Sequence, residues 1–453
     1  MITVMKFGGT SVGSPEALKR VADIIMNTES DKAVVVSAMS GVTNFLVGAS
    51  ENPDCDAEAV ARQFEAKHLE VASQVLGEAE MKAFRKDFDE RMGRLRALLG
   101  SEASRSDPYY RDDVTSQGER FSSLILAHML RARGADSVAL TSEDCGIVAE
   151  GSPLSGSADL ARTASNMAIK VKPHIRGGGI PVITGFYGIR NGAPLTFGRG
   201  GSDYSAAVVA NALDADLLEI WTDVDGFMSA DPRIVPGALL MDEMSYGEAA
   251  ELAYFGAKVL HPRTIEPVRT KHIPLKVRNS FRPEVPGTLI HQFSKPKGGL
   301  LKSVAMKTDL SIISIESAEI AFYPAIVGRI IEKIAENEVV IYSISTSLSS
   351  VAFLVHNNDV KATLNKLNSI NTSGDIEMIE VKSNVALICA VGDDLLGRCG
   401  VSGDIFSAVK EARANVEMIS EGASDVSLNF VVPMSKVTDV ISVLHKKYVR
   451  GEQ

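Results

Sequence analysis

The chain lacks a cysteine framework, since its 453 residues include four cysteines and no CxxC pair. Four scattered thiols are too few to cross-link a chain of this length, so an oxidising compartment is not indicated. The sequence also has no uninterrupted apolar run of about 18 residues, and its start lacks a basic region followed by an apolar stretch. We therefore expect a cytoplasmic protein that is neither secreted nor embedded in a membrane.

Positive charge is also scarce, because 47 Lys and Arg residues stand against 57 Asp and Glu residues, for a formal net charge of −10. Such a chain repels polyanions, so no nucleic-acid partner is expected. No GxxxxGK[ST] string occurs, which disfavours a P-loop fold. The 45% apolar and 23% charged residues are ordinary for a globular protein, and the length predicts two or three domains.

Short β-rich runs alternate with helical segments as far as about residue 290, the pattern of a sheet covered by helices on both faces. Ser14-Pro15-Glu16 has the residue types that begin a helix. Residues 57–99, rich in charge and almost free of glycine and proline, predict long surface helices. The predicted strands are Ile2–Phe7, Ala33–Ser37, Pro181–Phe186, Leu217–Val224 and Ile273–Val277.

A basic segment rich in helix breakers, Ser294 to Gly299, predicts a connection between domains. Beyond it, the order strand, helix, strand, strand, helix occurs twice with a period of roughly 75 residues. The first copy begins with a strand over Leu310–Ile315 and the second with a strand over Val385–Val391. The tail is therefore expected to be a tandem duplication of a small α+β module.

A cation and two glycines follow the first predicted strand in the run Lys6-Phe7-Gly8-Gly9. Glycines let backbone N–H groups approach phosphate oxygens, and the helix that follows adds the positive end of its dipole. Lys6 could then neutralise charge that develops during phosphoryl transfer. The same run also fits an ordinary turn before a helix, so both interpretations stay open.

A second glycine-bearing turn, Gly198-Arg199-Gly200-Gly201-Ser202-Asp203, precedes a helix predicted over Tyr204–Leu213. Arg199 can bind a carboxylate through paired N–H donors, and Asp203 can hold Mg²⁺ or an ammonium group. Ser202 or Asp203 can equally cap the helix. The mixture of groups suits a charged substrate or a metal-bound nucleotide.

Two further runs place charge at turns. Trp221-Thr222-Asp223-Val224-Asp225-Gly226 follows an apolar strand, and ligands collect at the carboxyl ends of strands in open α/β sheets. Asp231-Pro232-Arg233 and Lys258 add cations, although turn and surface roles explain such residues equally well. His261 has no metal-ligand spacing and is expected to be structural, and no metal site is predicted.

Six runs, in order, resemble aspartokinases of the amino acid kinase family. They are KFGGTSVG from Lys6, VVSAMSGVTN from Val35, SQGER from Ser116, GRGGSDYSA from Gly198, WTDVDG with DPR, and FGAKVLHPRT. The duplicated tail is similar to the paired ACT modules of aspartokinases. The resemblance implies an α/β fold class, with an open, mainly parallel sheet sandwiched by helices (the amino acid kinase fold), followed by two ferredoxin-like ACT modules. The implied domains are 1–291, 304–378 and 383–453.

The resemblance implies ATP-dependent phosphorylation of the β-carboxylate of L-aspartate to 4-phospho-L-aspartate, in the biosynthesis of lysine, threonine and methionine. ATP and Mg²⁺ are the implied cofactors, and Lys6 and Asp203 are implied at the reaction centre. The implied aspartate contacts are Thr43, Glu119, Arg199, Gly200, Gly201 and Ser202. The implied ATP contacts are Lys6, Phe7, Gly8, Gly9, Thr222, Asp223, Arg233, Lys258 and Val259.

The sequence departs from the family pattern in places. Gly226-Phe227-Met228 stands where many relatives have tyrosine before the DPR turn, and Tyr342 stands where lysine-sensitive relatives tend to have aspartate. The first module has Ala318 to Pro324 where a glycine-rich loop is expected. The second module keeps four glycines that can expose backbone groups to an amino acid, namely Gly392, Gly397, Gly400 and Gly403.

Lysine or threonine is the expected effector, and a homodimer or higher homo-oligomer through the ACT modules is the expected assembly. The alternatives are a related kinase acting on another carboxylate, such as acetylglutamate, and a catalytically inactive amino-acid sensor. Both ACT modules could also serve only as a dimer interface. No extension similar to homoserine dehydrogenase follows the tail, so a single activity is expected.

Overall fold

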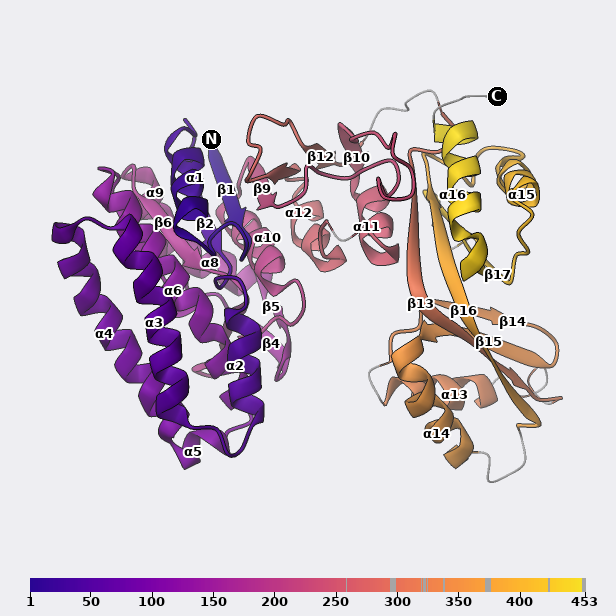
Figure 1. Ribbon diagram of the computed structural model, residues 1–453, viewed down its shortest axis with the longest axis horizontal. Helices are drawn as coiled ribbons and strands as arrows, with labels where there is room; N and C mark the ends of the chain where they lie inside the picture. Colours follow the sequence, from indigo (N-terminus) through magenta and orange to yellow (C-terminus); the bar gives the residue numbers. More distant parts are fainter. Residues whose placement is uncertain are drawn as a thin grey trace. The chain divides into compact units, whose positions relative to one another are not determined.

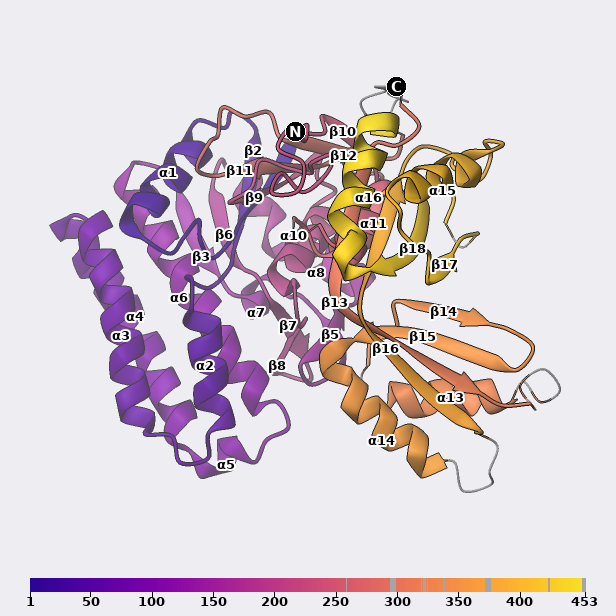
Figure 2. The same ribbon diagram turned by 45° about the vertical axis from the view of Figure 1, so that its right-hand side comes forward.

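The computed structural model describes residues 1–257, 259–293, 299–318, 320, 323, 325–336, 339–370, 376–422 and 424–449 (Figures 1 and 2). The chain divides into two compact units. The first comprises Met1–Phe227, Leu240–Tyr246 and Lys258–Ser294, and the second comprises Met228–Leu239, Gly247–Ala257 and Lys295–Gln453. Two short segments of the predicted kinase domain therefore belong to the second unit, and the domain limits drawn from the sequence stay a prediction.

An eight-stranded sheet forms the centre of the first unit, in the order β10-β12-β11-β9-β1-β2-β6-β3. All neighbouring pairs are parallel except β11 with β12, so the prediction of a mainly parallel sheet is confirmed. The positions of the five predicted strands are confirmed, and their ends differ by a few residues. The bounds are β1 Ile2–Phe7, β2 Asp31–Val36, β3 Ser137–Leu140, β6 Ile180–Thr184, β9 Leu217–Thr222, β10 Glu243–Ser245, β11 Leu275–Asn279 and β12 Thr288–His291.

Helices lie on both sides of this sheet, as Figures 1 and 2 show. Alternate residues of β1 and β2, such as Met5 and Val34, pack in one core with helices α1, α3, α4 and α6. Helix α10 packs on β1, β2 and β9 and against α8 and α12. The helices are α1 Pro15–Met26, α2 Val42–Glu51, α3 Ala57–Val75, α4 Glu78–Gly100, α5 Glu102–Arg105, α6 Tyr110–Ala132, α7 Ser142–Cys145, α8 Leu160–Lys170, α9 Lys172–Arg176, α10 Gly201–Leu213 and α12 Ile265–Arg269.

The helical excursion predicted over 57–99 is present as α3 and α4, but these helices also bury aromatic side chains. Phe121 of α6 packs edge-on against Phe64 of α3 and Phe88 of α4, with ring centroids 4.9 and 5.1 Å apart. Helix α6 was not predicted from the sequence, although 18 of its 23 residues are buried. Within the described part of the chain, no helix is both long and apolar enough to cross a membrane.

Asp112, in the first turn of α6, anchors two loops near the site described below. Its carboxylate accepts hydrogen bonds from the backbone N–H groups of Leu154 and Thr196, at 3.0 and 2.7 Å, and from the Thr196 hydroxyl at 2.6 Å. Leu154 connects the hairpin strands β4 (Ala149–Ser152) and β5 (Ser155–Ala158), and Thr196 ends β8 (Ala193–Thr196). Because Asp112 is fully buried, these bonds replace its hydration.

Replacing Asp112 by alanine is expected to lower the free energy of unfolding by about 3 kcal/mol, because buried donors would lose a charged acceptor. Urea denaturation followed by circular dichroism measures this loss. Asp113→Ala is the matched control, since the Asp113 carboxylate accepts a bond only from the Gln117 side chain among the described contacts. Equal losses in the two variants would show that the Asp112 contacts do not stabilise the fold.

The second unit contains one six-stranded antiparallel sheet, in the order β14-β15-β13-β16-β18-β17. The predicted order strand, helix, strand, strand, helix is confirmed in both copies (Figure 2). The first copy has β13 Ser303–Glu316, α13 Ala325–Ala335, β14 Ser343–Thr346, β15 Ser350–His356 and α14 Val360–Ile370. The second copy has β16 Met378–Val391, α15 Val401–Glu411, β17 Met418–Ser420, β18 Ser427–Pro433 and α16 Val437–Leu444.

The two copies share this sheet because their first strands, β13 and β16, pair with each other from Ser303 opposite Val391 to Glu316 opposite Met378. Both strands have 14 residues and are longer than the sequence predicted. Each copy still has its own core, around Phe353 in the first and Phe430 in the second.

Helix α11 (Tyr246–Phe255) lies almost wholly in the second unit, although its residues fall within the kinase-domain limits of 1–291 predicted from the sequence. Glu248 of α11 forms a buried ion pair with Lys302, at 2.7 Å. In the other segment that joins this unit, the Ser229 hydroxyl lies 2.8 Å from Nε2 of His445. These contacts explain why the two segments pack with the duplicated tail.

Candidate active site

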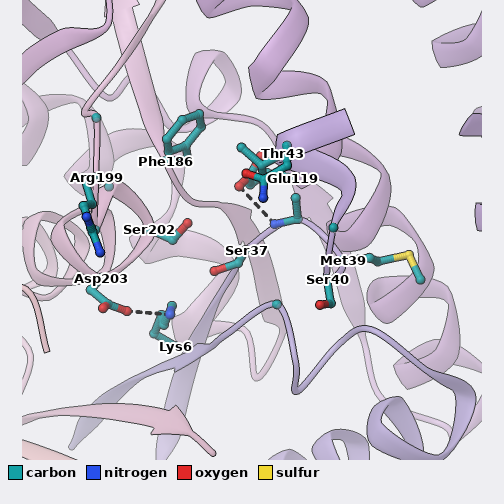
Figure 3. A pocket seen from close by; sticks show the side chains of 17 residues that line it. Lys6, Ser37, Met39, Ser40, Thr43, Glu119, Phe186, Arg199, Ser202 and Asp203 are labelled. Carbon is teal, nitrogen blue, oxygen red and sulfur yellow. Dashed lines mark hydrogen bonds and ion pairs between the residues drawn. The ribbon is translucent and has the colours of Figure 1, made fainter. Parts of the chain in front are cut away.

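A cavity of about 390 Å³ lies at the carboxyl ends of β1, β2 and β6 in the first unit (Figure 3). Its walls come from the end of β1, the loop from β2 into α2, one residue of α6, the residue Phe186 beyond β6, and the turn before α10. In an open α/β sheet this edge is where ligands bind. The lining residues are Lys6, Gly9, Ser37, Ala38, Met39, Ser40, Gly41, Thr43, Asn44, Glu119, Phe186, Gly198, Arg199, Gly200, Gly201, Ser202 and Asp203.

The two glycine-bearing turns meet in this cavity through an ion pair. Nζ of Lys6 lies 2.5 Å from Oδ1 of Asp203, and the two side chains are 9% and 18% exposed. Lys6 belongs to a buried central strand, so its position is fixed by the sheet. A cation held this way can meet the negative charge of a phosphoryl group without having to reorganise.

The turn from Gly198 to Asp203 opens helix α10 and needs glycine at two points. Gly198 and Gly200 have φ of +69° and +72°, which side chains disfavour, and a Cβ on Gly200 would lie 2.3 Å from Cβ of His261. The turn presents Arg199, Ser202 and Asp203 to the cavity beside the positive end of α10 (Figure 3). This wall therefore suits an anionic ligand.

Glu119 of α6 provides a buried carboxyl group in the same cavity. A Cβ on Gly118 would lie 2.5 Å from Cβ of Ala38, so only glycine lets α6 approach the loop after β2 this closely. The Ala38 N–H then donates to Oε1 of Glu119 at 3.0 Å, while Oε2 is buried without a hydrogen-bond partner among the described residues. Burial raises the pKa of Glu119 to about 8, and the Ala38 bond only partly offsets this.

The charges around the cavity match a small zwitterion with an extra carboxylate. Arg199 can bind a carboxylate through paired N–H donors, and Oε2 of Glu119 can accept a bond from an ammonium group. Thr43, in the first turn of α2, adds a hydroxyl to the same wall. All six residues predicted to contact the amino acid line the cavity together with Lys6 and Asp203.

The residues predicted to contact ATP occupy neighbouring strand ends, but only part of the set lines the cavity. Strands β1 and β9 are parallel with Phe7 opposite Trp221, and the Gly8 N–H donates to the Trp221 carbonyl at 3.2 Å. Thr222 and Asp223 therefore follow directly beside the Gly8-Gly9 turn. The Phe7 side chain is buried and stacks on Trp221 with centroids 6.0 Å apart, which leaves only its backbone for a ligand.

Two other predicted ATP contacts are not among the described lining residues, and a third lies outside the described part of the chain. Val259 belongs to the first unit but is not among the described lining residues. Arg233 belongs to the second unit, where it is paired with Asp231 at 2.6 Å. Lys258 lies outside the described residues.

Phe186 lines the cavity and was not predicted from the sequence. A strand was predicted through it, but β6 ends at Thr184 and Phe186 has φ of +78°, a rare conformation for a bulky side chain. A Cβ on Gly201 would lie 2.8 Å from the Phe186 ring. Strained residues of this kind gather at binding sites. Only the glycine before Phe186 hinted that the strand ends early.

Comparison with known proteins agrees with the two parts of the fold described above. The family model of the amino acid kinase family matches residues 1–279, and an ACT domain model matches residues 388–448. Lysine-sensitive aspartokinase 3 of Escherichia coli is 31% identical over 452 residues, covering 98% of each chain. Bifunctional aspartokinase/homoserine dehydrogenase 1 of Arabidopsis thaliana is 32% identical over 98% of this chain. The chain spans about half the length of that and the other bifunctional relatives.

Solved structures agree over the whole chain. E. coli aspartokinase III in complex with aspartate and ADP superimposes with a TM-score of 0.83 at 30% identity, covering 98% of this chain and 99% of that one. The same enzyme in complex with lysine and aspartate also gives a TM-score of 0.83. The match of the kinase model to more than half of the chain, with these full-length relatives, shows that the protein is an aspartokinase-type member of the amino acid kinase family with an ACT tail.

Proposed function

We propose that the protein transfers the terminal phosphoryl group of ATP to the side-chain carboxylate of L-aspartate. The observation that supports this most directly is one cavity in which Lys6, Glu119 and Arg199 face a common space (Figure 3). The related E. coli aspartokinase III was solved with aspartate and ADP. The residues that would bind aspartate line this cavity, and Thr222 and Asp223, which would bind ATP, lie at the end of the neighbouring strand β9.

The acceptor needs no base, because a carboxylate is ionised and nucleophilic at neutral pH. Glu119 would bind the ammonium group of aspartate, and Arg199 would bind its α-carboxylate. An oxygen of the side-chain carboxylate is then left to attack the γ-phosphorus. A new O–P bond forms as the bond to the ADP oxygen breaks, giving an acyl phosphate and ADP. Lys6 would neutralise the transferring group from its fixed place on β1, so catalysis is positioning plus charge stabilisation.

Mg²⁺ would arrive with the nucleotide. Within the described residues no group of three or more His, Cys, Asp or Glu side chains is placed so that it could hold a metal ion. Mg²⁺ is commonly bound by one or two carboxylates plus phosphate oxygens, and Asp203 can supply one such carboxylate. The ion would spread the negative charge of the phosphates.

The test is ADP release with Mg-ATP and a panel of amino acids, with hydroxylamine added to trap any acyl phosphate. We expect hydroxamate from aspartate and not from glutamate or N-acetylglutamate. Hydroxamate from another carboxylate alone would establish the related-kinase alternative. No ADP release with any member, despite amino-acid binding measured by calorimetry, would establish the sensor alternative.

Arg199→Lys is expected to raise the KM for aspartate about tenfold while changing the KM for ATP little. Lysine keeps the charge but loses the planar pair of donors that a carboxylate accepts. Steady-state kinetics with each substrate varied in turn measures both constants. Lys170→Arg, on the surface helix α8, is the control for exchanging one basic side chain for another. Equal KM values for aspartate in the parent protein and Arg199→Lys would exclude a bidentate contact.

Regulation by lysine belongs to the same proposal, since the E. coli relative is named lysine-sensitive and was also solved with lysine. In this chain Nζ of Lys307 lies 4.4 Å from the Tyr342 ring centroid and 6.0 Å from that of Tyr254. These rings show that aromatic groups of the second unit can hold an alkylammonium group. Adding lysine or threonine to the kinase assay separates the two candidate effectors, and light scattering tests the proposed homo-oligomer.

A further inference from the structure

The turn that carries Arg199 and Asp203 is held at both of its ends by one side chain outside the cavity, Arg263. Its Nη1 donates to the carbonyl of Phe197, the residue before the turn, at 2.9 Å. Its guanidinium carbon lies 4.8 Å from the ring centroid of Tyr204, the residue after Asp203. The side chain therefore contacts the residues on either side of the Gly198–Asp203 turn.

The same guanidinium also reaches the β4–β5 hairpin. Its Nη2 donates to the Gly156 carbonyl at 2.8 Å, and the backbone N–H of Ala158 donates to the Tyr204 hydroxyl at 3.1 Å. Phe197 and Tyr204 pack edge-on, with centroids 5.1 Å apart. Arg263 thus joins the hairpin, the start of the turn and the first turn of α10 into one packed group.

The segment that carries Arg263 also covers the middle of the turn. Arg263 lies in the short helix Pro262–Thr264, whose N-terminal cap is His261, and Nδ1 of His261 accepts a bond from the Arg263 N–H at 3.3 Å. The His261 side chain lies against Gly200, where any Cβ would collide with it. Displacing this segment would remove support from the beginning, middle and end of the turn.

The charge of Arg263 is not used in an ion pair or in the cavity. Among the described residues no carboxylate oxygen lies within ion-pair distance of it, and it is not one of the described lining residues. Two carbonyls and one aromatic face satisfy it instead, a combination that needs a planar guanidinium. A lysine ammonium could reach one carbonyl but could not bridge both and stack.

We propose that Arg263 is a positioning residue that fixes the turn so that Arg199, Ser202 and Asp203 face Lys6. This inference rests on the proposed function and adds a determinant of aspartate use that acts without touching either substrate. Loss of the Arg263 side chain lets the Gly198–Asp203 turn shift by small distances. A shift of about 1 Å in groups that orient a reacting carboxylate can cost about 100-fold in rate.

The test compares Arg263→Ala and Arg263→Lys with the parent protein. For Arg263→Ala we expect kcat/KM for aspartate to fall about 10- to 100-fold, with a KM for ATP within about twofold. Arg263→Lys should recover only a small part of the loss. Methylguanidinium added to Arg263→Ala should restore activity in a saturable way, which a general loss of stability would not allow.

Arg269→Ala is the matched control, because Arg269 lies six residues later in α12 and pairs only with Glu266 among the described contacts, at 2.9 Å. It should keep the parent kinetics and should not respond to methylguanidinium. Parent-like aspartate kinetics in Arg263→Ala would overturn the inference, as would equal losses for aspartate and ATP. If Arg263→Ala does not fold, Arg263→Lys with full aspartate activity would overturn it as well.

Failure of the proposed function gives a different result from failure of this inference. A parent protein that forms no aspartyl hydroxamate would refute the proposed function. In that case calorimetric titration of aspartate into the parent protein and the Arg263 variants still tests whether Arg263 supports the binding turn. An unchanged dissociation constant there would overturn the inference independently.

Discussion

Lys6→Ala is expected to lower turnover by about 10²- to 10³-fold while leaving the KM for aspartate within a few-fold of the parent value. The Lys6 ammonium is the one described cation that is both buried in the cavity and fixed by a sheet strand. Removing a preorganised charge that acts on the transferring group costs an effect of this size. Steady-state release of ADP at saturating aspartate and ATP measures it.

The variant would also leave Asp203 in the cavity without its partner at 2.5 Å. The double variant Lys6→Ala/Asp203→Ala should therefore regain thermal stability without regaining turnover. Lys172→Ala is the control, since Lys172 pairs with Asp214 at 2.8 Å and is not among the described lining residues. Turnover near the parent value in a folded Lys6→Ala protein would remove Lys6 from the mechanism.

The parts of the fold that could be predicted from the sequence are those with local signals. The apolar run before Lys6 and the cap at Ser14 specify a strand, a turn and a helix within a few residues, and all three are present. The duplicated order of strands and helices in the tail could also be predicted, because the apolar periodicity of each element is visible in both copies. The two glycine-bearing turns were recognisable for the same reason, since glycine is needed where a Cβ would collide.

The parts that could not be predicted depend on contacts between distant residues. The left-handed conformation of Phe186 is held by a hydrogen bond from the Phe197 N–H to its carbonyl at 2.8 Å, and no local pattern encodes that pairing. From the local sequence, Arg263 is indistinguishable from a surface cation beside a proline. The pairing of β13 with β16 likewise joins strands from different copies, so a repeat suggests two separate modules where one sheet exists.

The KM for aspartate is expected to fall about tenfold for each pH unit between pH 6 and pH 8 and to level off above pH 8. The pKa of Glu119 is raised to about 8 by burial, so its carboxyl is mostly protonated in the empty cavity at neutral pH. Binding an ammonium group requires the ionised form, and the proton must leave first. Aspartate affinity therefore rises with pH until Glu119 is already ionised before binding.

Glu119→Gln should raise the KM for aspartate about 100-fold at pH 8 and abolish this pH dependence, because the amide keeps the shape but offers no charge. Glu143→Gln is the control, since Glu143 pairs with Arg120 at 2.5 Å and is not among the described lining residues. Measuring the KM for aspartate of both variants from pH 6 to pH 9 separates an effect of the Glu119 charge from a general effect of removing a carboxylate. A slope that persists in Glu119→Gln would assign the proton to another group.

The same raised pKa predicts the opposite trend for stability of the empty protein. The unfolded chain loses the Glu119 proton near its ordinary pKa of 4.5, whereas the folded chain keeps it up to about pH 8. The stabilising contribution of the neutral carboxyl is thus complete below pH 4.5 and is lost as pH rises to 8, by at most about 1.4 kcal/mol for each unit. Glu119→Gln should remove this loss, so its melting temperature should exceed that of the parent increasingly toward pH 8, although it binds aspartate poorly. A gain in stability paired with a loss of affinity would show that burial of this carboxyl serves the substrate and not the fold.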